Sequence, residues 1–314
     1  MKLESSKIDV VNTLNMKILV KRDDLLESSF SGNKARKLQF FLENDNKNIE
    51  KLISYGSMQS NNMYSMSSLA KIKNWEYIYY TNREEEFINE HSNEGNLRES
   101  LKNGMKIISL NEDDYSIMKL KYEKENGIID KTLIIREGAA QKNVMDYGFK
   151  KLANEIENYC YDNDINNLKV FVPSGTGGTA LYLQKFLKFD VYTTNCVGDS
   201  EYLTKQFKEL DEDSNNHPTI LKTNKKYRYG KLYKENYEII QQIKKDTKIQ
   251  FEYMYDPKGF LSILENKKEF NNSTLMYIHC GGILGNEIMK KRYLKKYKDL
   301  NNEIENDISY NTHI

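Results

Sequence analysis

The feature that most constrains the fold of this chain is a repeated alternation between short apolar runs and longer segments with helical periodicity. The short runs are rich in β-branched and aromatic residues and predict strands at Lys17–Lys21, Lys51–Tyr55, Glu76–Thr81, Met105–Leu110, Thr132–Ile135, Lys169–Val172, Asp190–Thr194 and Thr274–His279. Between two of them, Met63, Met66, Leu69 and Ile72 fall on one helical face and predict a buried stripe. Strands and helices in alternation predict an α/β fold with mostly parallel sheets.

Length and charge exclude several classes of protein. The 314 residues suffice for one large domain or two smaller ones. Lys and Arg number 47 against 46 Asp and Glu, and this balance argues against a nucleic-acid or acidic membrane partner. No apolar run approaches the roughly 20 residues of a membrane span, and residues 1–11 show no leader pattern. We therefore expect a cytoplasmic protein.

The cysteines and histidines lack the spacing of a metal site. Cys160, Cys196 and Cys280 lie far apart and form neither a C-x-x-C pair nor a disulfide framework. The histidines show no H-E-x-x-H or related ligand spacing. We expect no metal.

A glycine-rich segment is the strongest local signal. Ser174–Thr179 follows a predicted strand and precedes a helical pattern. Its backbone N–H groups, its hydroxyls and the helix N-terminus suit a phosphate. The same residues also match G-x-G-x-x-A, with Asp199 at a suitable distance beyond, so the motif alone leaves a dinucleotide site open.

Two further loops of small polar residues also follow predicted strands. Gly56–Asn62 offers neutral donors at a helix N-terminus, which suits a carboxylate, although simple capping by Ser60 or Asn61 explains it equally well. His279–Gly282 ends the last strand. Because ligands of parallel α/β folds bind beyond the carboxyl ends of strands, the three loops predict one composite site.

Taken in order, these segments resemble the fold-type II pyridoxal-phosphate enzymes, and among them the 1-aminocyclopropane-1-carboxylate deaminase and D-cysteine desulfhydrase family. The likeness spans most of the chain and is far more specific than the glycine loop alone. Ser174–Thr179 looks like the family's phosphate loop. The other matching segments are Lys21–Leu25 (K-R-E-D-L in the family), Ser31–Leu38 (G-N-K-x-R-K-L), Gln59–Asn61 (Q-S-N), Tyr255–Lys258 (Tyr-x-Gly-Lys) and His279–Gly282 (His-Thr-Gly-Gly).

The resemblance implies a set of contacts with pyridoxal phosphate. Lys34 would carry the cofactor and then, as a free amine, move protons. Asn61 would hydrogen-bond the ring oxygen. Asp256 or Cys280 would face the pyridine nitrogen, and we favour Asp256 because an ionised acid keeps that nitrogen protonated. The phosphate would be held by Ser174, Gly175, Thr176, Gly177, Gly178 and Thr179.

The resemblance also implies how a small amino acid is held and cleaved. Gln59, Ser60 and Asn62 would bind its carboxylate, while Tyr229, Tyr255 or Ser60 would supply the acid, base or nucleophile. Departures from the family pattern leave the substrate open. Asn62 replaces the usual His or Gln, and Pro257 and Cys280 replace Gly and Thr.

The fold implied by the resemblance has two α/β domains, each with a mostly parallel sheet flanked by helices, as in the tryptophan synthase β-like proteins. Residues 1–46 with 152–314 would form the cofactor domain, and residues 47–151 a smaller inserted domain. The implied protein is a homodimeric deaminase or lyase that releases ammonia and a 2-oxo acid. Two alternatives stay open: an NAD-binding Rossmann oxidoreductase, and a catalytically inactive protein that binds pyridoxal phosphate.

Overall fold

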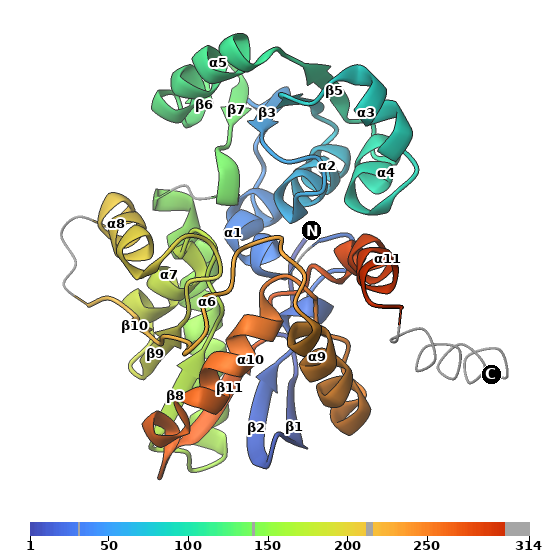
Figure 1. Ribbon diagram of the computed structural model, residues 1–314. Coiled ribbons are helices and arrows are strands. Elements are labelled where there is room, and N and C mark those ends of the chain that lie inside the picture. Colours follow the sequence, from blue (N-terminus) through green and yellow to red (C-terminus); the bar gives the residue numbers. More distant parts are fainter. Residues whose placement is uncertain (31, 140–141, 212–215, 299–314) are drawn as a thin grey trace, which may run out of the picture.

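The computed structural model describes residues 1–30, 32–139, 142–211 and 216–298, and Figure 1 shows their two sheets one above the other. Ser31 of the lysine motif and residues 299–314 of the expected cofactor domain lie outside these ranges. The larger sheet has the order β1 (Ile8–Thr13), β2 (Met16–Lys21), β11 (Thr274–Ile278), β8 (Leu168–Phe171), β9 (Asp190–Thr193) and β10 (Thr219–Ile220). The smaller sheet has the order β5 (Lys106–Ser109), β4 (Glu76–Thr81), β3 (Lys51–Tyr55), β7 (Thr132–Ile134) and β6 (Gly127–Ile129).

Both sheets are mostly parallel, which confirms the predicted fold class. In the larger sheet only the edge strand β1 runs antiparallel to its neighbour, and in the smaller sheet only the edge strand β6 does so, among the described strands. All the predicted strands are present to within about a residue at each end, whereas β1, β6 and β10 were not predicted.

Helices cover both faces of the larger sheet, as its burial pattern requires. In β11, Leu275 and Tyr277 enter one apolar cluster, and the alternate residues Met276 and Ile278 enter another. The second cluster includes α6 (Lys142–Asp162), α7 (Gly178–Phe186) and α8 (Ser200–Leu210). The first includes α9 (Lys234–Thr247), α10 (Asp256–Glu265) and α11 (Asn286–Lys296).

The smaller sheet packs on α1 (Gly32–Glu43) and α2 (Asn61–Lys73), with α4 (Gly95–Lys102) beyond α2. The chain also forms α3 (Glu85–His91), α5 (Glu112–Lys124), η1 (Asp23–Leu25), η2 (Glu137–Ala139), η3 (Lys267–Phe270) and η4 (Ile283–Gly285). Of the predicted α2 stripe, Met63, Met66 and Leu69 are buried, but Ile72 is 41% exposed. The prediction was wrong for Ile72 because it lies in the last turn of α2, which ends at Lys73.

Helix α1 lies between the two sheets, where it contacts both α2 and α6 (Figure 1). Gly148 allows the close approach to α6, because a Cβ there would lie 2.0 Å from the carbonyl oxygen of Arg36. Arg36 is fully buried and pairs with Asp23 at 2.9 Å and with Glu155 of α6 at 2.7 Å, and Glu155 also pairs with Lys21 of β2. These charge-assisted bonds fix the start of α1 relative to the larger sheet.

Candidate active site

A cavity of about 700 Å³ opens between the two sheets, beyond the carboxyl ends of β3, β8 and β11. The three predicted loops meet there, as the position of ligand sites in parallel α/β folds requires. Every predicted site residue lines this cavity; the set is Lys34, Gln59, Ser60, Asn61, Asn62, Ser174, Gly175, Thr176, Gly177, Gly178, Thr179, Tyr229, Tyr255, Asp256 and Cys280.

Lys34 lies in the first turn of α1. Burial lowers the pKa of its amine to about 8, because a low-dielectric surrounding disfavours the charged form. Its Nζ lies 3.4 Å from Oδ1 of Asn33, and the backbone N–H of Asn33 donates to the carbonyl of Cys280 at 3.0 Å. The start of α1 is therefore tied to the loop after β11, and the lowered pKa gives the Lys34 amine a larger neutral, nucleophilic fraction near neutral pH than an exposed lysine has.

The glycine loop is built to admit an anion at the N-terminus of α7. Gly177 caps this helix with φ of +78°, and a Cβ on Gly175 would lie 3.1 Å from the Tyr255 ring. Among the described residues, no acceptor pairs with the backbone N–H groups of Gly175 through Gly178. Several donors at a helix N-terminus with no internal partner suit a phosphate group.

The loop after β3 presents a different set of groups. Gly56 has φ of +132°, and Ser60 caps α2 by accepting the backbone N–H of Asn62 at 3.1 Å. The Ser60 hydroxyl keeps its own hydrogen to donate. The Asn62 side chain is 4% exposed, and neither of its amide atoms has a partner in the described part of the chain. Buried unpaired amides beside a cavity indicate a polar ligand.

Both groups of the Gln59 side-chain amide are bonded to the N-terminal end of α4. Its Oε1 accepts the backbone N–H of Asn96 at 3.0 Å, and its Nε2 donates to the carbonyl of Glu94 at 3.3 Å. The substrate contact predicted for Gln59 therefore stays a prediction, and a contact through its amide would compete with these bonds.

Two tyrosines that line the cavity contact one another through their hydroxyls. The hydroxyls of Tyr229 and Tyr255 lie 3.0 Å apart, and the Tyr229 ring is 50% exposed. Burial raises the pKa of Tyr255 well above its ordinary value, with a further contribution from Tyr229. The Tyr255 hydroxyl is therefore protonated at neutral pH and can donate a hydrogen bond.

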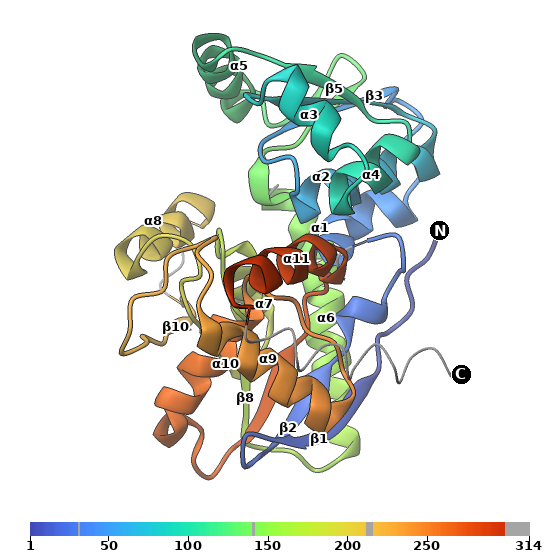
Figure 2. The ribbon, with the colours of Figure 1, turned by 45° about the vertical axis from the view of Figure 1, so that its right-hand side comes forward.

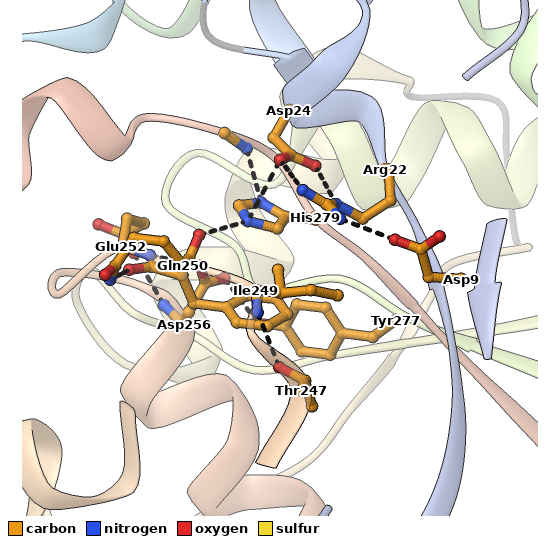
Figure 3. Close-up of polar contacts among 12 residues, drawn as sticks. Asp9, Arg22, Asp24, Thr247, Ile249, Gln250, Glu252, Asp256, Tyr277 and His279 are labelled. Atoms are coloured by element: carbon orange, nitrogen blue, oxygen red, sulfur yellow. Dashed lines mark hydrogen bonds and ion pairs between the residues drawn. The ribbon is translucent and has the colours of Figure 1, made fainter. Parts of the chain in front are cut away.

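Asp256 and Glu252 form a buried acidic pair beside the cavity (Figure 3). Each carboxylate accepts the backbone N–H of the other residue, at 3.0 and 2.8 Å, and Asp256 also accepts the hydroxyl of Tyr277 at 2.7 Å. Burial raises the pKa of each acid to about 7, and for Asp256 the neighbouring charge of Glu252 adds to the rise. A cationic ligand group beside Asp256 would favour its ionised form.

A buried histidine supports the loop after β11. His279 stacks on Phe251, accepts the backbone N–H of Gly281 at 3.1 Å and lies 2.9 Å from the carbonyl of Gln250 (Figure 3). The next residue, Cys280, has a thiol whose pKa is raised well above its ordinary value by burial. A protonated thiol is a poor partner for a cationic ring nitrogen, so Asp256 is the better candidate.

Among the cavity residues that were not predicted as site residues, three make polar contacts at or beside the predicted loops. Lys37 lies one turn after Lys34, and its Nζ donates to the carbonyl of Gly138 at 2.6 Å and lies 3.3 Å from the Cβ position of Gly178. Asn96 comes from α4, and Glu252 is the partner of Asp256. Lys37 belongs to the matched lysine motif, which was its only sequence signal.

The dinucleotide alternative loses support from the geometry of Asp199. Its carboxylate accepts the backbone N–H of Tyr202 at 2.8 Å and thereby caps α8. In a dinucleotide site the corresponding acid must accept hydroxyls of a ribose. Within the ranges that the structure describes, no group of three or more His, Cys, Asp or Glu is placed to hold a metal ion. No helix in those ranges is long and apolar enough to cross a membrane.

Comparisons with known proteins agree with this geometry. No model of a known protein family matches the chain. A Thermotoga maritima protein described as a 1-aminocyclopropane-1-carboxylate deaminase is 25% identical over 292 residues, covering 85% of this chain and 89% of its own length. The Arabidopsis thaliana bifunctional D-cysteine desulfhydrase/1-aminocyclopropane-1-carboxylate deaminase is 24% identical, covering 85% of this chain and 72% of its own.

The fold agrees with that of a solved relative. A crystal structure of a homologue of 1-aminocyclopropane-1-carboxylate deaminase matches with a TM-score of 0.71 at 20% identity, covering 93% of this chain and 94% of the other. The fold, the order of the loops along the chain and the curated relatives point the same way. The chain therefore has the fold of that solved structure, and its sequence is similar to those of proteins named as 1-aminocyclopropane-1-carboxylate deaminase and D-cysteine desulfhydrase.

Proposed function

We propose that this protein is a pyridoxal-phosphate-dependent deaminase or carbon–sulfur lyase that releases ammonia and a 2-oxo acid from a small amino acid. The observation that carries the proposal is the position of Lys34, whose amine of lowered pKa shares one cavity with the open glycine loop at α7. The relatives named as a deaminase and as a desulfhydrase support it.

The cavity residues fit the cofactor at each of its polar positions. The unpaired N–H groups of Gly175 to Gly178 suit its phosphate, with Ser174, Thr176 and Thr179 adding hydroxyls. We assign the ring oxygen to Asn61 and the pyridine nitrogen to Asp256. A buried acid whose pKa lies near 7 in the absence of a cationic ligand is well suited to ionise beside a protonated ring nitrogen.

Pyridoxal phosphate, when bound, supplies an electron sink that stabilises negative charge at the substrate α-carbon. The chain's own residues then position the substrate and move protons. The Lys34 amine would take or give the proton at the α-carbon. The Tyr255 and Tyr229 hydroxyls, or that of Ser60, would protonate a leaving group or attack a ring carbon. Ser60 and Asn62, with Gln59 behind them, would hold the substrate carboxylate.

The remaining expectations from the sequence form part of the proposal. We propose a homodimer, a cytoplasmic location, and a division into a cofactor domain of residues 1–46 with 152–314 and an inserted domain of residues 47–151. Sulfide would be released only from a thiol substrate, whereas a ring-opening reaction would yield ammonia and a 2-oxo acid alone.

The visible absorption spectrum of the purified protein tests the role of Lys34. We expect a visible band that is lost or shifted in Lys34→Ala and retained in Lys102→Ala, since Lys102 is an exposed lysine of α4. An unchanged band in Lys34→Ala would overturn the assignment. Retention of NAD with no visible band would favour the oxidoreductase alternative instead.

Turnover separates an enzyme from an inactive protein that binds the cofactor. Release of ammonia, 2-oxo acid and sulfide should be screened with D-cysteine, L-cysteine, D-serine and 1-aminocyclopropane-1-carboxylate. We expect release from at least one of these substrates, and its dependence on Lys34 ties it to the cavity. Cofactor binding without release from any of them would favour the inactive protein.

A further inference from the structure

Asn96, at the N-terminal end of α4, is a fully buried residue that clamps the loop after β3. Its Nδ2 lies 2.8 Å from the carbonyl oxygen of Gln59 and 3.0 Å from Oδ1 of Asn61. Its backbone N–H donates to Oε1 of Gln59. One residue of α4 therefore bonds to the side-chain amides of Gln59 and Asn61 and to the main chain of the loop that borders the cavity.

These contacts determine which way the amides point. The carbonyl oxygen of Gln59 can only accept a hydrogen bond, so the Asn96 atom that faces it is the NH₂ group. The same NH₂ group faces Asn61, so the Asn61 atom on that side is the accepting oxygen. The NH₂ group of Asn61 therefore points the other way, where it lies 2.5 Å from the position that a Cβ on Gly282 would occupy. A glycine at 282 leaves room for this donor beside the cavity.

We propose that Asn96 is a positioning residue that holds Asn61 with its NH₂ group turned into the cavity, so that Asn61 can donate to the ring oxygen of the cofactor. The inference rests on the proposed function for the identity of that oxygen. An anionic ring oxygen accepts hydrogen bonds, and the opposite orientation of Asn61 would place an acceptor against it. The two orientations of the Asn61 amide differ little in shape, so a fixed hydrogen-bond partner is needed to select one.

The place of α4 explains why this helix serves as the anchor. The N-terminal part of α4 is tied to α11 by the ion pairs Arg98 to Glu287 at 3.1 Å and Lys291 to Glu94 at 3.2 Å. Figure 2 shows the two helices close together, α4 from the smaller sheet and α11 from the larger. At its other end, Nδ2 of Asn103 donates to the hydroxyls of Ser67 and Ser68 on α2.

The chain thus offers a matched pair of variants. Asn96→Asp and Asn103→Asp each remove an NH₂ group that links α4 to the α2 region, but only position 96 contacts Asn61. A carboxylate at position 96 can only accept, and it would turn the Asn61 NH₂ group away from the cavity. We expect Asn96→Asp to raise the cofactor dissociation constant about tenfold or more and to shift the visible band to shorter wavelength. Asn96→Ala, which leaves Asn61 free to turn, should have a smaller effect, and Asn103→Asp should have neither effect.

The readouts separate failure of this inference from failure of the proposed function. A wild-type protein with no visible band would overturn the proposed function. A wild-type band that stays unchanged in position and affinity in Asn96→Asp would overturn the inference. Hydrogen exchange of the cofactor-free proteins tests the clamp without the cofactor. Faster exchange of residues 57–62 in Asn96→Asp and Asn96→Ala, but not in Asn103→Asp, would support the proposal that Asn96 holds this loop. Unchanged exchange of residues 57–62 in the two Asn96 variants would contradict it.

Discussion

At the scale of single residues, Lys37 is the cavity residue whose substitution gives the clearest test of phosphate binding. Its amine lies against Gly178 and Gly138, between the glycine loop and η2. Burial lowers the pKa of Lys37 well below its ordinary value, and the charge of Lys34 lowers it further. A phosphate dianion placed at the start of α7 would restore its charge and gain a charge-assisted hydrogen bond.

We therefore expect Lys37→Met to raise the cofactor dissociation constant roughly 10- to 100-fold, the equivalent of one hydrogen bond to a charged group. At saturating cofactor the visible band should remain, because Lys34 is intact. Titration of the cofactor-free protein at the band maximum measures this constant. Lys71→Met, at an exposed position on α2, is the control. Equal affinity in the two variants would show that Lys37 does not bind the phosphate.

The cavity residues also show where sequence patterns stop being informative. Lys34 and the glycine loop could be predicted because each lies in a contiguous motif with its own chemistry. Asn96 stands in an unremarkable charged segment, and its function follows from contacts with Gln59 and Asn61, 37 and 35 residues away. Only the fold brings α4 to that loop, so no local pattern marks Asn96.

At the scale of elements, two of the strands that were not predicted belong to hairpins with unusual turns. β1 and β2 are joined by Leu14 and Asn15, and β6 and β7 by Asp130 and Lys131. All four turn residues have positive φ, between 44° and 64°. Two-residue turns of this kind are normally marked by Asn-Gly or Asp-Gly. Without glycine the signal is missing, and the short, partly exposed β1 and β6 lack the continuous apolar pattern of the central strands.

The turn at 130–131 gives a prediction about stability. We expect Asp130→Asn combined with Lys131→Gly to raise the free energy of unfolding by about 1 kcal/mol, because glycine tolerates positive φ at Lys131 and asparagine does so at Asp130. The lost ion pair between Lys131 and Glu50 is exposed and contributes little. Urea unfolding measures the change.

A glycine placed inside a helix is the matched control for that double variant. Lys121→Gly in α5 should lower stability by about 1 kcal/mol, since a helical residue gains nothing from glycine. If the double variant in the 130–131 turn is also destabilised, the positive φ values of Asp130 and Lys131 do not destabilise the wild-type protein.

At the scale of the whole molecule, stability depends on buried acids whose pKa values move in opposite directions. Asp256 and Glu252 have pKa values raised to about 7 by burial, from ordinary values of 3.8 and 4.5. At Glu43, burial opposes the shift, but hydrogen bonds from Lys151, Gln39 and Tyr147 lower its pKa to about 2. A raised acid contributes stability below its unfolded pKa and loses it as pH rises through the folded pKa. A lowered acid contributes above its unfolded pKa and loses that contribution as pH falls through the folded value.

The pH windows of the raised and lowered acids overlap only between pH 3.8 and 4.5, so above pH 4.5 the contribution of the raised acids can be measured separately on the cofactor-free protein. Between pH 4.5 and 7 the folded state binds more protons at Asp256 and Glu252 than the unfolded state, and we expect their contribution to fall as pH rises. Asp256→Asn should flatten this decline. Glu43→Gln should lower the free energy of unfolding only above about pH 2, where the wild-type carboxylate contributes, and the loss should become constant above pH 4.5. Urea unfolding of wild type, Asp256→Asn and Glu43→Gln from pH 3 to pH 8 measures both pH dependences.

Bound cofactor should also flatten the decline in stability between pH 4.5 and 7, because a protonated ring nitrogen beside Asp256 favours the ionised acid. A decline between pH 4.5 and 7 of equal slope in wild type and Asp256→Asn would mean that Asp256 does not bind its proton more tightly in the folded protein.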